Sequence, residues 1–304
     1  MNIEYPLEIA INGRQIGPTN YPYFIAEAGV NHNGDINIAF EMINLAKEAG
    51  ADAIKFQIFS PSDLILKNVK KVEYQISEKN YNENQYQMLD RLKTGIEKQK
   101  VIKEYCNKVN IEYLCTPFDE KSLYELSGIN INSLKIASTD TTNISFIMKA
   151  AKLNIPTFLS TGMTSMKEVE IAVNKFSSIN RKLILMQCTG NYPTKPNDIN
   201  LNVIKTYINK FKCIVGFSDH SSGNYASFAA VSKLVSNVNS ILIFESSSLL
   251  SDVISLIPEI PDRESSIISV TSRSRILDDA PVYTVVTVTT GRSISGYSLI
   301  VNLS

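Results

Sequence analysis

The sequence has few of the residues that usually carry metal and redox chemistry. Its 304 residues contain no tryptophan, only two histidines (His32 and His220) and four cysteines without any C-x-x-C spacing. Scattered cysteines of this kind favour free thiols in a reducing cytoplasm over a disulfide framework or a zinc site. We therefore expect a cytoplasmic protein in which a bound metal has at most two imidazoles available.

An excess of charge and long apolar segments are also absent. The 30 basic side chains balance the 30 acidic ones, so no charge excess favours nucleic acid or a membrane surface as a partner. The sequence does not open on a secretory signal pattern, and no apolar run approaches the roughly 20 residues that a membrane helix needs. A hydrophobic content of 44% with 20% charged residues is typical of an ordinary soluble globular protein.

What the sequence does contain, between about residues 23 and 233, is a regular alternation of strand and helix patterns. Helices are indicated by an N-cap at Asp35, a capping box in residues 165–168 and an apolar stripe that begins at Tyr225. The strands expected between the helices are short apolar runs at residues 23–28, 52–58, 111–115, 133–137, 156–160, 183–188 and 213–217.

Seven strand-then-helix units in series predict a parallel α/β sheet with right-handed crossovers. No G-x-G-x-x-G follows the first strand, so a doubly wound dinucleotide-binding sheet lacks its usual signature. We therefore predict a (β/α)8 TIM barrel in residues 1–233. Residues 60–95 form a long connection, and in barrels such loops often cover the active-site mouth.

Both histidines lie just after an apolar strand, which is where barrels carry their chemistry. His220 ends the segment Gly-Phe-Ser-Asp-His, and His32 lies within the polar segment 28–35. One interpretation of either histidine is a turn residue that bonds its own backbone. The other is a metal site at His220 with Asp219 as its carboxylate neighbour and His32 as the only possible second imidazole.

Two lysines, Lys55 and Lys135, lie on predicted buried strands. An ammonium group is costly to bury without a partner, so an anion shared by both lysines inside one barrel would explain their position. The alternative is that each reaches past the strand end to solvent. Glu27 on the first strand could balance these charges or orient a sugar hydroxyl. Hydroxyl groups suited to phosphate or carboxylate binding follow other strands, at Thr116, Ser138 and Ser160.

The sequence changes character near residue 234. No lysine occurs after Lys233, and residues 234–304 are rich in serine and in Val, Ile and Thr runs. This tail is either a small β-rich appendage or a segment that did not evolve with the barrel. On the second interpretation the barrel is incomplete at its eighth unit, and the seventh strand keeps an unpaired outer edge.

Six short motifs occur in order along the barrel segment, at residues 24–34, 55–57, 116–119, 135–138, 160–163 and 216–220. Their sequences, order and spacing resemble the sialic acid synthase family, the bacterial N-acetylneuraminate and nonulosonic acid synthases. The resemblance runs from about residue 20 to residue 233 and is specific, because it rests on six motifs rather than one.

This resemblance implies a (β/α)8 barrel that condenses phosphoenolpyruvate with an N-acetylated amino sugar, such as N-acetylmannosamine, and releases phosphate. It also implies a homodimer and a divalent cation, Mn²⁺ or else Mg²⁺, that polarises the sugar aldehyde and is bound by His220. Glu27, Lys55 and Lys135 would form the catalytic set. By the same resemblance, phosphoenolpyruvate would be held by Lys55, Thr116, Lys135, Ser138, Ser160 and Ser218, and the sugar by Glu27, Gln57 and Tyr192.

Three features depart from the family pattern. The asparagine expected before Tyr192 is displaced by one position, to Asn191. No histidine follows His220, although the family's eighth strand supplies a second metal histidine, and Glu245 brings only a carboxylate there. The family's antifreeze-like domain, which lends an arginine to the partner subunit's site, is not recognisable in residues 234–304.

These departures predict weak cation binding and low activity for this chain, and they weaken the expectation of a homodimer. Two alternatives to a working synthase remain. One is a non-catalytic or truncated barrel remnant. The other is a different phosphoenolpyruvate-dependent aldol synthase, for which the chain offers few arginines to bind a second phosphate.

Overall fold

The computed structural model describes residues 4–17, 20, 22–71, 83–223, 225–227 and 229–230 with their side chains. It also gives the backbone of strands at residues 243–246, 268–275, 282–290 and 296–303. Within these parts of the chain, no helix has the length and apolar character needed to cross a membrane.

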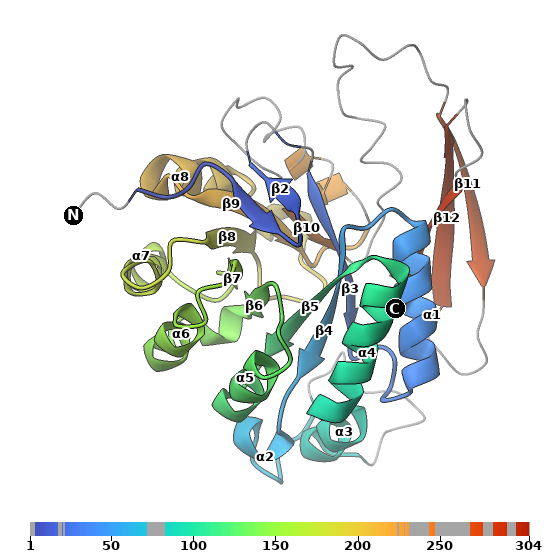
Figure 1. Ribbon diagram of the computed structural model, residues 1–304, viewed down its shortest axis with the longest axis horizontal. Helices are drawn as coiled ribbons and strands as arrows, with labels where there is room; N and C mark the ends of the chain where they lie inside the picture. Colours follow the sequence, from blue (N-terminus) through green and yellow to red (C-terminus); the bar gives the residue numbers. More distant parts are fainter. Residues whose placement is uncertain are drawn as a thin grey trace.

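Eight parallel strands form the central sheet (Figure 1). They are β3 (Tyr23–Gly29), β4 (Ala53–Ile58), β5 (Glu112–Pro117), β6 (Leu134–Ile136), β7 (Thr157–Ser160), β8 (Leu183–Cys188), β9 (Ile214–Asp219) and β10 (Ile243–Ser246). Their hydrogen-bonded order is β5-β4-β3-β10-β9-β8-β7-β6. The end strands β5 and β6 lie side by side, so the sheet closes on itself and the predicted (β/α)8 barrel is confirmed.

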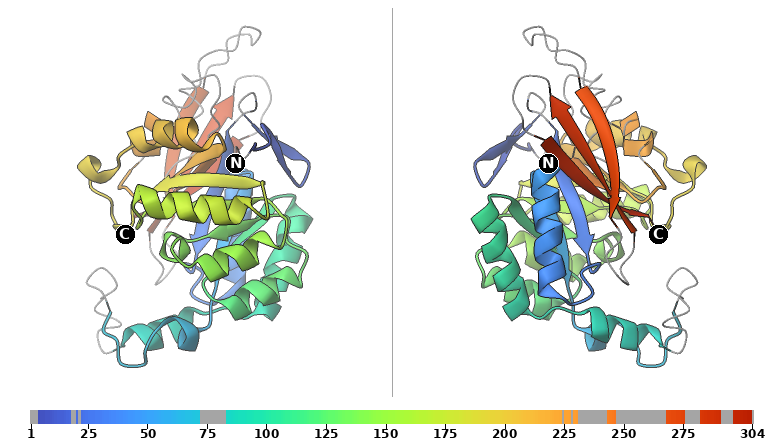
Figure 2. Two further views of the ribbon diagram at one scale, coloured as in Figure 1. Left: turned by 90° about the vertical axis from the view of Figure 1, so that its left-hand side faces the viewer. Right: turned by 90° about the vertical axis from the view of Figure 1, so that its right-hand side faces the viewer.

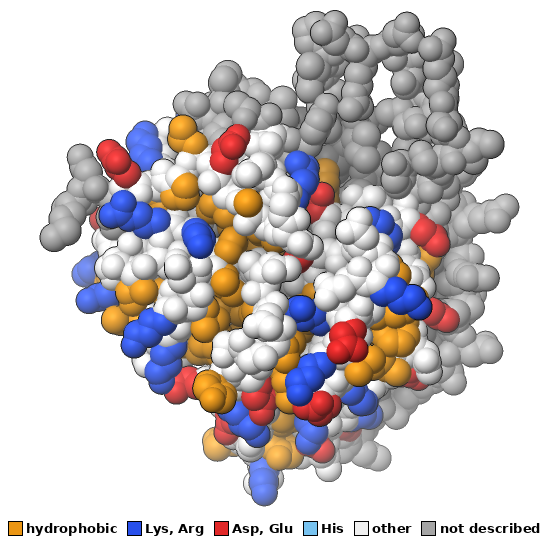
Figure 3. All heavy atoms as spheres, in the orientation of Figure 1, with side chains coloured by type: hydrophobic (Ala, Val, Ile, Leu, Met, Phe, Trp, Pro, Cys, Tyr) orange, Lys and Arg blue, Asp and Glu red, His pale blue; other side chains and the backbone are white. Residues whose placement is uncertain are grey.

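Helices cover the outside of the barrel (Figures 1 and 2). They are α1 (Ile36–Glu48), α2 (Pro61–Leu64), α3 (Gln85–Leu92), α4 (Ile96–Val109), α5 (Glu120–Ser127), α6 (Ile144–Ala151), α7 (Met166–Ser177) and α8 (Asn202–Phe211), with the 3-10 turns η3 (Ser138–Asp140) and η4 (Pro196–Asp198). Lys and Arg side chains are interspersed with Asp and Glu on the face shown in Figure 3, so that face carries no field of a single sign.

The start signals predicted for two helices are confirmed. The Asp35 side chain accepts a hydrogen bond from the backbone of Asn37 at the start of α1, and Ser165 and Glu168 form the capping box of α7. The apolar stripe predicted after β9 is wrong at its first residue, because Tyr225 is 84% exposed while its neighbour Ala226 is buried.

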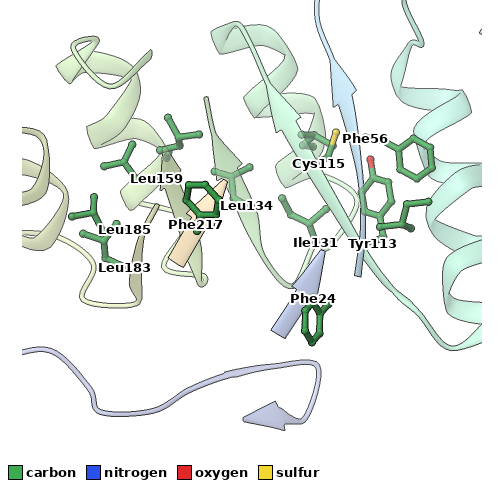
Figure 4. Packing of buried hydrophobic residues seen from close by; sticks show 14 of the residues in the cluster. Phe24, Phe56, Tyr113, Cys115, Ile131, Leu134, Leu159, Leu183, Leu185 and Phe217 are labelled. Atoms are coloured by element: carbon green, nitrogen blue, oxygen red, sulfur yellow. The ribbon is translucent and has the colours of Figure 1, made fainter. Parts of the chain in front are cut away.

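Side chains alternate between the two faces of each strand, and this alternation builds two cores. Outward-facing residues such as Phe56, Tyr113, Leu134 and Leu185 pack in the layer between the sheet and the helices (Figure 4). A second, inward-facing cluster fills the barrel toward the starts of the strands. It consists of Ile9, Ile11, Ile16, Tyr23, Ile25, Ala53, Leu114, Phe158, Ile184, Met186 and Ile214.

A short hairpin closes the barrel at the end where the strands begin. Its strands β1 (Ile9–Ile11) and β2 (Arg14–Ile16) pair antiparallel, and their isoleucines belong to the inward-facing cluster. This apolar plug leaves the carboxyl ends of the strands as the end available for polar chemistry, which is the usual arrangement in barrels.

The eighth strand is present, because β10 pairs in parallel with β9 on one side and with β3 on the other. In this register Glu245 stands opposite Ser218 and Ile25. The predicted unpaired outer edge of the seventh strand is therefore wrong. A four-residue segment of the tail satisfies the backbone groups of both neighbouring strands.

The remainder of the tail contributes a separate antiparallel sheet of β11 (Ile268–Arg275), β12 (Val282–Thr290) and β13 (Gly296–Leu303). The backbone of β13 runs beside α1 (Figure 2). Most other residues of the segment 234–304 lie outside the described part of the chain. The division into a barrel and an atypical tail without an antifreeze-like domain therefore stays a prediction.

The long connection predicted at residues 60–95 contains two helices, α2 and α3. Both lie near the end of the barrel where β4 ends (Figure 1). Helix α3 begins with a reciprocal capping box between Asn84 and Gln87, which the sequence analysis missed. Residues 72–82 of this connection lie outside the described residues.

Candidate active site

The inward faces of the strands change from apolar to polar toward the carboxyl ends. Several polar residues follow an apolar residue of the inner cluster by two positions, as Lys55 follows Ala53, Ser160 follows Phe158 and Glu27 follows Ile25. A period of two keeps such residues on the same face of a strand. The inward-facing set at this end of the barrel is Glu27, Lys55, Gln57, Thr116, Lys135, Ser160, Cys188 and Ser218.

Lys55 lies between a carboxylate and a hydroxyl group. Nζ of Lys55 is 2.5 Å from Oε2 of Glu27, its register partner on β3, and 3.4 Å from Oγ1 of Thr116 on β5. The Lys55 residue is only 4% exposed. The alternative that this lysine reaches past the strand end to solvent is therefore wrong.

The side chains of Glu27 and Gln57 flank Gly29 at the end of β3. A Cβ atom on Gly29 would lie 2.9 Å from Oε1 of Glu27 and 3.6 Å from Nε2 of Gln57. Gly29 has φ +53°, and the register of β3 with β4 shifts between Glu27 and Gly29. This irregularity brings two side chains of the predicted sugar-binding set to one point.

Lys135 is 3% exposed on β6, and it interacts electrostatically with Lys55. The pKa of Lys135 is lowered to about 7, first by burial and then by the charge of Lys55, while Cys188 and Glu27 act against the shift. Lys55 and Lys135 are thus both buried on strands of the same barrel, and the cavity and anion that they would share stay a prediction.

Hydroxyl groups from β7 and the turn after β6 complete this end of the cavity. Oγ of Ser138 accepts a hydrogen bond of 2.8 Å from the backbone N–H of Gly162. Oγ of Ser160 is buried and has no hydrogen-bond partner among the described residues. A buried hydroxyl without a partner costs free energy, so it indicates a group that accepts its hydrogen bond when the site is filled.

Tyr192 and His220 form a second polar group, close to Cys188 on β8. Their rings stack with centroids 4.0 Å apart, and Oη of Tyr192 is 2.7 Å from Nε2 of His220. Nδ1 of His220 is 2.7 Å from the carbonyl oxygen of Thr189. Sγ of Cys188 lies 3.7 and 3.9 Å from the two ring nitrogens.

His32 does not join this group. Its side chain is fully buried beside Phe56, and Nδ1 accepts a 3.0 Å hydrogen bond from the backbone N–H of Gly34. Burial lowers the pKa of His32 to about 4, and the charge of Lys98 adds to this shift. The geometry supports the interpretation of His32 as a turn residue, and no hydrogen bond or ring contact among the described residues joins it to His220.

Asp219 is not a ligand beside His220 either. Its carboxylate accepts hydrogen bonds from the backbone N–H of Ser221 at 2.8 Å and from the hydroxyl of Ser227 at 2.6 Å. These contacts anchor the turn that carries His220. The Asp219 carboxylate is therefore bonded to the segment that follows β9.

The side chains at His220 do not fit the divalent cation that the family resemblance implies. Among the residues with described side chains, no three His, Cys, Asp or Glu residues form a group that could hold a metal ion. Glu245 stands opposite Ser218 in the strand register, but its side chain lies outside the described part. His220 therefore offers a single imidazole nitrogen, and that nitrogen already bonds to Tyr192.

Two residues of this region were missed by the sequence analysis as contributors to the site. Cys188 faces inward, and the period-two pattern of β8 would have indicated it. Burial acts to raise the pKa of the Cys188 thiol, but hydrogen bonding to His220 and the charges of His220 and Lys135 outweigh it, so the pKa is lowered.

The second missed residue is Asp119, which joins the ends of two strands. Its carboxylate accepts hydrogen bonds from the backbone N–H of Ser60 at 2.8 Å, after β4, and from the N–H and hydroxyl of Ser122 at 2.7 and 2.8 Å, in α5. An Asp followed three residues later by Ser at a helix start is a capping signal that sequence could have supplied.

The fold and the site together define an α/β barrel with two buried lysines, Lys55 and Lys135, on its strands. A family model described as the NeuB family matches residues 42–236, well over half of the sequence. The chain belongs to the NeuB family.

Several curated relatives are named as synthases of legionaminic, neuraminic or pseudaminic acids. The chain is 39% identical over 219 residues to the N,N'-diacetyllegionaminic acid synthase of Legionella pneumophila, which covers 70% of this chain and 62% of that protein. It is 35% identical over 230 residues to the human N-acetylneuraminate-9-phosphate synthase, covering 74% of this chain and 63% of that protein. The chain thus spans slightly less than two thirds of the length of these relatives.

Solved structures agree with this placement. An N-acetylneuraminic acid (sialic acid) synthetase of Leptospira borgpetersenii superposes with a TM-score of 0.67 at 33% identity, covering 79% of this chain and 78% of that one. A truncated 3-deoxy-D-arabino-heptulosonate 7-phosphate synthase of Thermotoga maritima superposes with a TM-score of 0.56 at 14% identity. At that identity the second likeness supports the barrel fold alone.

Proposed function

We propose that this chain binds phosphoenolpyruvate between Lys55 and Lys135 and condenses it with an N-acetylated amino sugar to a nonulosonic acid, with release of phosphate. The observation that carries the proposal is that two lysines, Lys55 and Lys135, are buried on strands of the same barrel. Phosphoenolpyruvate has a phosphate and a carboxylate, so it supplies the negative charge that two buried cations require.

The hydroxyl groups around these lysines support the same ligand. Thr116 lies beside Lys55, Ser160 has a buried hydroxyl without a partner among the described residues, and Ser138 and Ser218 belong to the same end of the barrel. Each can donate one hydrogen bond to a phosphate or carboxylate oxygen. This agrees with the residue set that the family resemblance assigns to phosphoenolpyruvate.

The reaction needs few covalent steps from the protein. C3 of the enolpyruvate attacks the aldehyde carbon of the open-chain sugar, water adds to C2, and phosphate leaves with cleavage of the C2–O bond. Lys55 and Lys135 hold the anion and stabilise its charge, which electrostatic catalysis requires of preorganised groups. Glu27, Gln57 and Tyr192 would bind the hydroxyl groups of the sugar, as the family resemblance implies. No step is assigned to a cation, because the described side chains do not fit one.

The class of acceptor rests on the relatives rather than on the site. The synthases named above make legionaminic and neuraminic acids, which share the nonulosonic skeleton. The proposal therefore specifies an N-acetylated amino sugar with a free aldehyde, without choosing a member. A heptulosonate-type aldol synthase is not favoured, since that likeness is one of fold at 14% identity. A cytoplasmic homodimer, as in the family, completes the proposal.

Titration calorimetry with phosphoenolpyruvate tests the anion site directly. We expect Lys55→Ala and Lys135→Ala each to weaken binding at least tenfold, because a charge-assisted hydrogen bond contributes roughly 1.5–3 kcal/mol. Lys100→Ala is the matched control, since Lys100 is exposed on α4 and its ammonium group pairs with Glu97 at the surface. Unchanged affinity in both cavity variants would overturn the proposal.

Condensation is then measured as phosphate release from phosphoenolpyruvate in the presence of N-acetylmannosamine. We expect release to depend on both substrates and to be lost in Lys55→Ala. The same assay also measures the rate of condensation, which we expect to be low because residues 234–304 lack the second metal histidine of the family pattern. Binding of phosphoenolpyruvate without any release in the presence of acceptor sugars would favour a non-catalytic barrel.

A further inference from the structure

Gln57 lies at the point where β4 loses one of its two neighbouring strands. The pairing of β3 with β4 ends at Gly29 and Phe56, after a shift in register, whereas β5 still pairs with Gln57 through Thr116. A backbone carbonyl beyond the last pair of a ladder needs another partner when it is withdrawn from water. The carbonyl of Gln57 finds this partner outside the sheet.

The partner is Gln99, in the first turn of α4. Its Nε2 donates a 3.0 Å hydrogen bond to the carbonyl oxygen of Gln57 and a 2.7 Å hydrogen bond to the hydroxyl of Thr94. Its Oε1 accepts a 2.6 Å hydrogen bond from the hydroxyl of Tyr113 on β5. Both N–H groups and the oxygen of this amide are therefore bonded.

These contacts fix the orientation of the Gln99 amide. The carbonyl of Gln57 can only accept, so the amide nitrogen must face it and the amide oxygen faces Tyr113. Gln99, Thr94 and Tyr113 are 0%, 3% and 2% exposed, and the ring of Tyr113 stacks on Phe56 in the layer between the sheet and the helices (Figure 4). A buried polar network that is fully bonded specifies one arrangement of the atoms around it.

The same turn of α4 also holds the segment that follows β3. Nζ of Lys98 donates a 2.7 Å hydrogen bond to the carbonyl oxygen of Gly34. Two successive residues of α4, Lys98 and Gln99, thus bond to the ends of the β3 and β4 segments, the strands that carry Glu27 and Gln57. This turn therefore supports two of the residues that the proposed function assigns to the sugar.

We propose that Gln99 is a positioning residue, which sets the side chain of Gln57 toward the acceptor sugar by holding the carbonyl of Gln57. The inference rests on the proposed function, in which Gln57 binds that sugar. The hydrogen bond fixes the ψ angle of Gln57, and the side chain leaves from the same Cα atom. Lys55 needs no such support, because it has register partners on both sides, Glu27 on β3 and Leu114 on β5. Gln99 should therefore act on the sugar and not on phosphoenolpyruvate.

Nitrogen-15 NMR of the full chain tests the position of Gln57 without any assay of catalysis. Its side-chain amide signal is assigned by its loss in Gln57→Ala. We expect Gln99→Met, which keeps an unbranched side chain of similar length, to shift this signal. Tyr113→Phe removes only the hydroxyl that orients the Gln99 amide, so it should shift the signal by less, and it serves as the test if Gln99→Met does not fold. Gln187→Met is the matched control and should leave the signal unchanged, because Gln187 is a buried glutamine that donates to the carbonyl of Ile199 instead.

Substrate measurements then separate positioning from a general loss of stability. We expect Gln99→Met to raise the KM for N-acetylmannosamine in the phosphate-release assay about tenfold, as loss of one sugar hydrogen bond would. The Kd for phosphoenolpyruvate, measured by calorimetry, should stay within about twofold. In a Gln57→Ala background, Gln99→Met should raise the KM no further, because both substitutions remove the same contact.

An unshifted Gln57 signal in both Gln99→Met and Tyr113→Phe would overturn the inference. So would an equal shift in Gln187→Met, a KM that rises further in the double variant, or an equal loss of affinity for phosphoenolpyruvate. Absence of phosphate release from the unaltered protein would instead overturn the proposed condensation, and the Gln57 signal would still decide whether Gln99 positions Gln57.

Discussion

Lys55 and Glu27 occupy opposite positions in the register of β4 and β3, and their charged groups are 2.5 Å apart inside the barrel. Lys55 thus has a carboxylate that offsets its charge, whereas Lys135 has a pKa lowered to about 7 by burial and by the charge of Lys55. Near neutral pH, Lys135 is therefore close to equal populations of its charged and neutral forms. An anion in the cavity favours the charged form, so its binding should be accompanied by proton uptake.

The first prediction concerns the stability cost of Lys135. The ordinary pKa of a lysine is about 10.4, so between pH 7 and pH 10 the unfolded chain binds more protons at this position than the folded one. The contribution of Lys135 to the free energy of unfolding is therefore unfavourable at pH 7 and becomes less unfavourable as the pH rises to 10. We expect Lys135→Met to stabilise the anion-free protein by up to a few kcal/mol at pH 6, and by much less at pH 9.

Urea unfolding at the two pH values measures this difference, with Lys100→Met as the control at an exposed lysine of α4. Addition of phosphoenolpyruvate at a fixed concentration should stabilise the unaltered protein more than it stabilises Lys135→Met. An equal effect of the substitution at pH 6 and pH 9 would show that Lys135 carries no depressed pKa.

The barrel could be predicted from sequence because its signals are local and repeated. The apolar runs that gave the strands and the capping box at Ser165 depend only on neighbouring residues, and the structure confirms them. The inward position of Lys55 follows from the period of two along a strand. Other features depend on tertiary contacts that sequence does not show. The hydrogen bond between Tyr192 and His220 joins residues 28 positions apart.

Two predictions from the sequence were wrong, and each has a specific physical cause. Tyr225 was assigned to a buried stripe from spacing alone, but Ala226 faces the core in its place. The segment Ile243–Ser246 lies in an unusual tail, yet it completes the sheet because any short extended segment can satisfy backbone groups on both sides. Strand pairing depends on the backbone, so the composition of the tail did not predict it.

The second prediction concerns His32 and acid. Its pKa is lowered to about 4 from the ordinary value of about 6.5, chiefly by burial. Between pH 4 and pH 6.5 the folded protein therefore binds fewer protons at His32 than the unfolded chain does. The free energy of unfolding decreases for this reason as the pH falls from 6.5 through 4. The loss approaches roughly 3 kcal/mol at pH 4 and below.

The measurement is the free energy of unfolding at pH 7, 5.5 and 4.5 for the unaltered protein and for His32→Gln. The difference between the two proteins isolates this group from carboxylates that titrate in the same range. We expect the advantage of the unaltered protein to shrink steadily with falling pH, and to do so also in a His220→Gln background. A difference that does not change with pH would contradict the assignment.

The third prediction uses Gly162, which links the two hydroxyl-bearing turns of the cavity. A Cβ atom at this position would lie 3.0 Å from Oγ of Ser138, from Sγ of Cys188 and from the backbone nitrogen of Gly190. Two of these neighbours are side-chain atoms that could shift, but the nitrogen of Gly190 is backbone and donates to the carbonyl oxygen of Gly162. Gly162→Ala should therefore destabilise the protein by about 1–3 kcal/mol and weaken phosphoenolpyruvate binding by displacing Ser138.

Gly95→Ala is the matched control for this substitution. Gly95 is the N-cap of α4 with φ −74°, and a Cβ atom there would meet nothing within 4 Å, so the cost should be limited to the poorer N-cap that alanine makes, about 0.5–1 kcal/mol, and phosphoenolpyruvate binding should not change. Thermal unfolding and titration with phosphoenolpyruvate compare the two alanine variants. If Gly162→Ala matched Gly95→Ala in both measurements, the turns after β7 and β8 would not be packed as closely as these distances require, and the hydrogen bond that fixes Ser138 would have no role in the anion site.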